Sequence, residues 1–235
     1  MKKFFILLLA LIVLGAGALI ALSALNEGSE DPGTPSTGTE LDVFECAAKD
    51  VQPTKIVSLT SYTLAQDLNG DRLTLSGSFT QVSQGMNSIL DYKYQRIATP
   101  EDLAENYILE TEGAIAVKNG TYKQQIGDAM GSWEAIIPSL QQLGALKISK
   151  QALPSDYQLS SDGKKLTVSL SRQEALAALG VSIGGAQSDI SLEVQSNGKN
   201  ITLVKIAYTE ASGAAVTINT SYTYGKETLD FSRFN

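Results

Sequence analysis

The chain has 235 residues, of which 43% are hydrophobic and 18% are charged, and its formal net charge is −7. This composition is typical of a globular protein, and it disfavours nucleic acids and anionic lipid head groups as partners, because phosphate binding requires clustered Lys and Arg. The sequence has no histidine and one cysteine. It therefore excludes Ser-His-Asp and Cys-His catalysis, imidazole-based metal sites and an intramolecular disulfide, and it predicts no catalytic residue, metal ion or cofactor.

The first feature along the chain is an apolar stretch that begins at Phe4 and ends at Leu25, directly after two lysines. As a helix it would be roughly 33 Å long, enough to cross a bilayer, and the lysines would keep its start in the cytoplasm. Ala21 and Ser23 have the spacing of a cleavage site, whereas the length of the stretch favours a retained anchor. We predict that residues 1–25 are a signal peptide or a signal anchor. The rest of the protein would lie outside the cytoplasmic membrane, secreted or anchored by a single pass, with the membrane as a partner if the stretch is uncleaved.

Residues 26–50 are predicted to be a flexible linker, because they are rich in Gly, Pro, Ser, Thr and acidic residues. Cys46 lies well beyond the apolar stretch, so it does not occupy the position of a lipid-attachment cysteine. We interpret it as a small, half-buried apolar residue at the start of the folded domain. Intermolecular disulfide pairing is the alternative.

From Ile56 onward, two-residue alternation predicts strands with one buried face. Leu73, Leu75 and Phe79 alternate with Ser and Thr, and the pair Asn69-Gly70 predicts a turn that joins this strand to residues 56–65 in a hairpin. Further strands are predicted at residues 90–95, 107–110, 114–117, 121–125, 157–159, 166–170, 190–194, 201–208 and 216–224.

Helical signals interrupt the strands. A short helix is predicted at residues 99–106, and apolar residues at three- and four-residue spacing predict another at 127–146, kinked or divided at Pro138. Ser171 and Glu174 form a capping box, and Gly180 supplies the stop of a third helix. Residues 51–235 are therefore predicted to be one α+β domain, a large curved antiparallel sheet with short helices on one face.

Two short sequence patterns resemble a calcium site and a catalytic site, but the neighbouring residues disfavour both. Asp67, Asn69 and Asp71 have the spacing of a calcium loop, but Arg72 stands where that loop needs glycine, and a hairpin turn explains the same residues.

Ser161 with Lys164, and Ser196 with Lys199, have the Ser-x-x-Lys spacing of some acyl-transfer enzymes. Both pairs fall in predicted turns, where Ser and Lys are common. We therefore predict that the protein is not an enzyme.

The apolar side chains of the predicted helical segment are the candidate binding site. They either fill the core or line a cavity between the helices and the sheet, and an apolar cavity binds acyl chains without a catalytic residue. These residues are Met130, Trp133, Ile136, Ile137, Leu140 and Leu143.

The order of elements over residues 54–235 resembles the bacterial lipoprotein-carrier superfamily, the half-barrel proteins that carry or sense lipids outside the cytoplasmic membrane. The resemblance rests on the strand Asp91-Tyr92-Lys93-Tyr94-Gln95-Arg96, the hairpin Val117-Lys118-Asn119-Gly120-Thr121-Tyr122, a Trp-containing helical flap from Ser132 and a closing meander that ends at Tyr224-Gly225-Lys226. The chain departs from the family at its start, where residues 50–54 with Pro53 leave little room for an opening helix, and it lacks the lipid-attachment cysteine.

The resemblance implies non-covalent binding of a lipid or acyl group between the sheet and the flap. From it and from the export signal, we predict a non-catalytic carrier or sensor of lipid, acyl chains or lipoproteins. The alternative is a structural module of the cell envelope that binds protein or glycan through strand edges or surface tyrosines.

Overall fold

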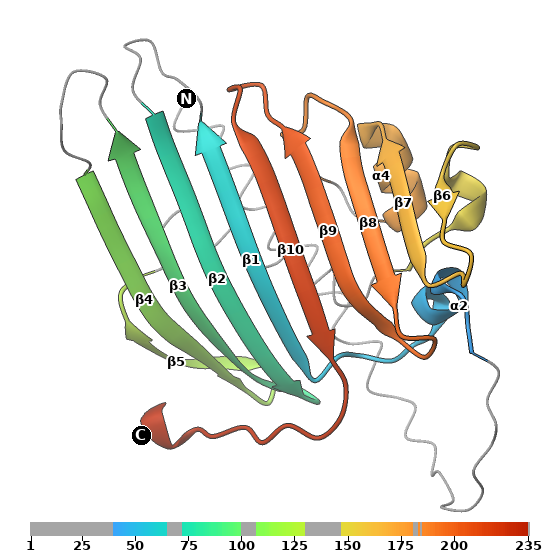
Figure 1. The fold of residues 1–235 in the computed structure, drawn as a ribbon. Helices are drawn as coiled ribbons and strands as arrows, with labels where there is room; N and C mark the ends of the chain where they lie inside the picture. Colours follow the sequence, from blue (N-terminus) through green and yellow to red (C-terminus); the bar gives the residue numbers. More distant parts are fainter. Residues whose placement is uncertain are drawn as a thin grey trace, which may run out of the picture. The chain divides into compact units, whose positions relative to one another are not determined.

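A ten-stranded, fully antiparallel sheet forms the body of the protein (Figure 1). The computed structural model describes residues 40–64, 72–99, 107–129, 147–180, 183 and 185–234. The strands are β1 Lys55–Leu64, β2 Arg72–Gln84, β3 Asn87–Thr99, β4 Tyr107–Lys118, β5 Thr121–Gly127, β6 Gln158–Leu159, β7 Lys165–Leu170, β8 Ile190–Ser196, β9 Ile201–Thr209 and β10 Ala215–Thr223. The helices are α2 Val43–Ala48, α4 Arg172–Leu179 and the 3₁₀ turns η3 Lys150–Ala152 and η4 Ser232–Phe234.

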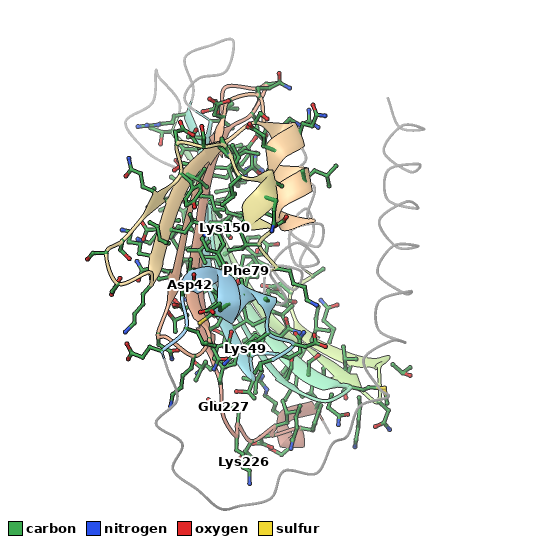
Figure 2. All side chains as sticks on the ribbon, turned by 90° about the vertical axis from the view of Figure 1, so that its right-hand side faces the viewer. Asp42, Lys49, Phe79, Lys150, Lys226 and Glu227 are labelled. Carbon is green, nitrogen blue, oxygen red and sulfur yellow. The ribbon has the colours of Figure 1, made fainter. Side chains whose placement is uncertain are left out.

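The sheet is open and consists of two consecutive meanders, one from β1 to β5 and one from β6 to β10. They meet where β1 pairs with β10, in a register that places Ile56 opposite Tyr222 and Thr60 opposite Ile218. Figure 2 shows β2–β5 curving toward the side on which α4 lies. The predicted α+β class, with a curved antiparallel sheet and few short helices, is confirmed.

Each strand presents alternate residues to the two faces of the sheet. We call the face on which α2 and α4 pack the inner face, and the opposite face the outer face. On β8 the inner-face residues Ile190, Leu192 and Val194 are fully buried, and they share one core cluster with Ala175 and Leu179 of α4. The main core therefore lies on the inner face.

The helix α2 lies within the segment that the sequence analysis assigned to the linker. The side chain of Asp42 accepts a hydrogen bond from the backbone N–H of Glu45, and the side chain of Glu45 accepts one from the backbone N–H of Asp42, each at 2.8 Å. This capping box starts the helix and directs Val43 and Phe44 into the core. Part of the predicted linker is therefore helical, and the chain has an opening helix that lies before residues 50–54, where the sequence left little room for one.

The helix α4 has the boundaries that its caps predict. Glu174 N–H donates to Ser171 Oγ at 3.2 Å, Ser171 N–H donates to Glu174 Oε2 at 2.7 Å, and Gly180 adopts a left-handed conformation with φ of 65°. The hydrogen bonds to Ser171 lower the pKa of Glu174. These contacts confirm the strongest local prediction of the sequence.

The outer face carries a smaller core beneath the C-terminal segment. Phe234 packs with Ile89 of β3 and with Ala114 and Ala116 of β4, and Leu229 and Phe231 lie against the same cluster. Arg233 forms an ion pair of 2.7 Å with Asp91, and this pair raises the pKa of the Arg233 guanidinium. Residues 226–234 therefore fasten the C-terminus to the outer face of β3 and β4.

Several predictions fall outside the described residues, namely the apolar stretch from Phe4 to Leu25, the turn at residues 67–71 and most of both helical segments at 99–106 and 127–146. Among the residues described, no helix has the length and apolar character needed to span a membrane. The two strands predicted at residues 107–110 and 114–117 form one continuous strand, β4, because Thr111, Glu112 and Gly113 pair with β3 without interruption.

Candidate functional site

The inner face changes character along the sheet. The contacts of α2 and α4 with the sheet fall mainly on β7, β8 and β9, where most inner-face residues are aliphatic. On β10, β1, β2 and β3 the same face carries hydroxyl groups and aromatic rings, and we call this region the central inner face. Its residues include Ser58, Thr60, Tyr62, Leu75, Phe79, Tyr92, Tyr94, Thr220 and Tyr222.

Four hydroxyl groups lie at the centre of this region. Ser58 and Thr220 stand opposite each other on β1 and β10, and their hydroxyl oxygens are 3.1 Å apart. The exposed fractions are 0% for Ser58 and Thr220, 3% for Thr60 and 6% for Tyr222. Thr60 Oγ1 and Tyr222 Oη have no hydrogen-bond partner among the described residues. Burial raises the pKa of Tyr222 and the neighbouring Thr220 hydroxyl lowers it by less, so this phenol stays protonated.

An aromatic cluster on β3 holds the chain where it leaves β5. The hydroxyl of Tyr92 donates to the backbone oxygen of Asp128, and the hydroxyl of Tyr94 donates to that of Ala129 at 3.2 Å. Gln125 Nε2 donates to Tyr92 Oη and to the Asp128 oxygen, each at 3.1 Å. Residues 128 and 129 therefore lie over the inner face of β3.

This cluster requires a glycine on β4. Gly113 stands opposite Tyr92 in the register, and a Cβ atom at this position would overlap the Tyr92 phenol. The aromatic ring therefore covers the glycine backbone, and any larger residue at position 113 would displace it.

At one end of the central inner face, Tyr62 donates a hydrogen bond of 3.0 Å to Glu210, in the turn between β9 and β10. Burial, with smaller contributions from Glu210 and Tyr62, raises the pKa of Tyr208 to about 12. The inner-face positions of β10, β1 and β2 carry no charged residue, and on β3 the basic Arg96 is exposed. The central inner face is therefore aromatic and rich in hydroxyl groups, and it is uncharged on β10, β1 and β2.

The outer face has a shallow groove of about 360 Å³ over β2, where the side chains of Ser76 and Ser78 are short. Leu59, 56% exposed, forms part of its floor. Its polar rim includes Lys93, Gln95, Glu110 and Asn219.

The six predicted cavity residues, Met130, Trp133, Ile136, Ile137, Leu140 and Leu143, lie outside the described residues. The described residues on either side of them belong to the inner face: Ala129 is held by Tyr94, and Ile148 is buried in the main core. Among the described residues, the buried hydroxyl groups lie on the sheet itself, and the sequence did not predict them as a site. The sequence contained a hint of their position, because Ser58 and Thr60 follow the buried Ile56 at two-residue steps and therefore face the same side of the strand.

The geometry of the described residues does not support the acyl-transfer and calcium sites that the residue spacings suggested. Ser161 is exposed, and the ammonium of Lys164 is 2.7 Å from the Glu40 carboxylate, which keeps that lysine charged and unsuited to act as a base. Lys199 is exposed as well. The calcium-loop candidates Asp67, Asn69 and Asp71 lie outside the described residues, and the described part of the chain holds no cluster of metal-ligating side chains.

Cys46 is buried in the core and is 4% exposed, which agrees with the interpretation that it is a packing residue. Its thiol lies 3.8 Å from the backbone oxygen of Leu41, and burial raises its pKa. A buried, protonated thiol is a poor nucleophile, so intermolecular disulfide formation would require local opening.

No protein-family model matches the sequence, and no curated protein matches it. Among solved structures, the chain is similar to an S-type phycobiliprotein lyase from Guillardia theta, with 11% identity, 80% of this chain and 95% of that chain covered, and a TM-score of 0.25. It is also similar to an AttH protein from Nitrosomonas europaea, with 7% identity, 86% and 60% coverage, and a TM-score of 0.22. Likeness at this level establishes neither a family nor a ligand, and the lipoprotein-carrier resemblance stays a prediction.

Proposed function

We propose that the protein is a non-catalytic carrier or sensor that binds a lipid or acyl chain on the central inner face, outside the cytoplasmic membrane. The observation that carries this proposal is the division of the inner face. The aliphatic part on β7–β9 packs against α2 and α4, whereas the buried part on β10 and β1–β3 combines hydroxyl groups and aromatic rings with apolar side chains.

The compartment in this proposal follows from the apolar stretch between Phe4 and Leu25 and the lysines before it. If the stretch is uncleaved, the protein is a tethered sensor or carrier. If it is cleaved, the protein diffuses. Sequencing the N-terminus of the protein isolated from its own cells distinguishes these two forms.

Ligand binding can be tested with the full-length chain and a matched pair of substitutions. Leu75 and Leu59 lie on neighbouring strands but on opposite faces, Leu75 on the inner face and Leu59 on the outer face. We expect native mass spectrometry to find a co-purifying lipid, and we expect Leu75→Trp to reduce its occupancy while Leu59→Trp leaves it unchanged. Absence of bound lipid from the unmodified chain in repeated preparations would contradict the proposal.

The outer groove favours a second candidate, an envelope module that binds a protein or a glycan through this surface. Its Ser, Gln and Asn side chains can form hydrogen bonds, and Leu59 supplies an exposed apolar contact. In this case Leu59→Trp would abolish binding of the partner and Leu75→Trp would not. The same pair of variants therefore decides between the two functions.

A further inference from the structure

The central inner face contains more hydrogen-bond donors than the described structure uses. Ser58, Thr60, Thr220 and Tyr222 each carry one hydroxyl donor. The contact between Ser58 and Thr220 uses one of these donors, and Thr60 and Tyr222 have no partner among the described residues. Leaving a buried hydroxyl unpaired costs about 1 to 3 kcal/mol, so the arrangement is unfavourable unless another group accepts these hydrogen bonds.

These hydroxyls lie side by side on adjacent strands. Thr220 of β10 is directly opposite Ser58 of β1, and Thr60 is the next inner-face residue along β1. On β2 the inner-face neighbour of Thr60 is Gly77, and that of Ser58 is Phe79. The donors therefore form a diagonal row across the two strands, which we call the hydroxyl band: Tyr222, opposite Ile56, lies at one end, Ser58 and Thr220 lie in the middle, and Thr60, opposite Ile218, lies at the other end.

The surrounding charges limit what can accept these donors. Burying a carboxylate or phosphate without a cation is costly, and the inner-face positions of β10, β1 and β2 carry no Lys or Arg. The acidic Glu210, in contact with Tyr62 at one end of this face, further disfavours an anion. A neutral acceptor within an apolar ligand fits the band better.

We propose that the hydroxyl band binds the neutral ester group of an acyl ester, whose carbonyl oxygen accepts from Thr60 and its neighbours while the chain lies along the apolar residues. This inference rests on the proposed function, and it adds the chemical class of the ligand. The band selects an acyl ester over a free fatty acid and over a plain hydrocarbon.

The test uses the full-length chain, stripped of lipid, and radiolabelled methyl palmitate in competition with palmitate and with hexadecane. One hydrogen bond typically contributes about a fivefold to tenfold change in affinity. We expect methyl palmitate to bind at least about fivefold more tightly than hexadecane and palmitate. Thr60→Val, which keeps the shape of the side chain, should remove most of this preference without weakening hexadecane.

Two further variants distinguish the loss of a hydroxyl group from a general effect on folding. Tyr222→Phe keeps the ring and removes the second unpaired donor, and it should lower the affinity for methyl palmitate alone. Thr217→Val, on the outer face of β10, is the matched control and should change none of the three affinities. Circular dichroism verifies that each variant is folded.

The outcomes are distinct. If hexadecane and methyl palmitate bind equally and Thr60→Val has no effect, the ester inference is wrong while lipid binding stands. If none of the three compounds binds the unmodified chain, the proposed function fails together with the inference. If palmitate binds more tightly than the ester, the band selects an anion and the inference is overturned.

Discussion

The two parts of the inner face have the same backbone arrangement but different side chains. On β7–β9 most residues are Leu, Ile and Val, and they are buried in the core that also contains residues of α2 and α4. On β10 and β1–β3 the residues facing the same way include Ser, Thr, Tyr and Phe among aliphatic residues such as Ile56, Ile218 and Leu75. Aliphatic side chains in a buried layer contribute to stability through packing alone. Hydroxyl groups in a buried layer lower stability unless they form hydrogen bonds. The difference separates the part of the sheet that chiefly stabilises the fold from the part to which we assign ligand binding in our proposal.

The largest expected effect tests the stabilising part. Leu192→Ala on β8 should lower the free energy of unfolding by about 2 to 5 kcal/mol, because it leaves a cavity in a fully buried site. Leu75→Ala on β2 should cost only about 1 kcal/mol, because this side chain is half-buried. Denaturant unfolding of both variants measures the difference, and equal losses would remove the distinction between the two parts.

A substitution of Gly113, which lies beneath the Tyr92 ring, should disrupt the aromatic cluster. Gly113→Ala should lower the free energy of unfolding by about 1 to 3 kcal/mol, because the new methyl group overlaps Tyr92. Tyr92→Leu in the same chain should recover part of the loss. A double-mutant cycle measures the coupling between positions 113 and 92, and additive effects would show that Tyr92 does not depend on the glycine.

The tyrosine pKa values give a pH dependence. The pKa of Tyr208 is raised from 10 to about 12, so the folded protein favours the neutral phenol. This stabilisation is complete below pH 10 and is lost as the pH rises from 10 through 12. Tyr208→Phe should reduce the slope of stability against pH in this window by about one proton. Denaturant unfolding at a series of alkaline pH values checks the slope, and an unchanged slope would mean that Tyr208 ionises equally in both states.

The smallest effect concerns the outer face. Arg233→Gln removes the ion pair with Asp91 and should lower the free energy of unfolding by about 0.5 kcal/mol, because both side chains are half-exposed. The loss should diminish at high salt, where screening already weakens the pair. A loss that is independent of salt would indicate that Arg233 acts through its contact with Phe234 instead.

The sequence predicted the strands well because alternation and turn residues are local signals. The capping box at Ser171 and the pairing of β1 with β2 both follow from such signals. The helix at Asp42 was missed because its acidic residues resemble those of the linker, although Asp42 and Glu45 have capping-box spacing.

The pairing of β1 with β10 could not be predicted in this way. It joins residues about 160 positions apart, such as Ser58 and Thr220, and no local pattern encodes such a contact. The hydroxyl band exists only across this pair. The candidate site was therefore placed by sequence in the helical segment at 127–146, and its position on the sheet required the tertiary structure.

The strand order has a consequence for how the chain can be cut and rejoined. Read from one edge to the other, it is β6, β7, β8, β9, β10, β1, β2, β3, β4, β5, which is an uninterrupted up-and-down sheet with the first and the last strand adjacent at its centre. Lys55 lies opposite Thr223, so a short hairpin could connect β10 directly to β1. A circular permutant that starts at β6 and ends at β5 would have only neighbour-to-neighbour pairings. Such a chain would convert the one long-range closure of the sheet into a local turn, and it should fold faster than the natural order.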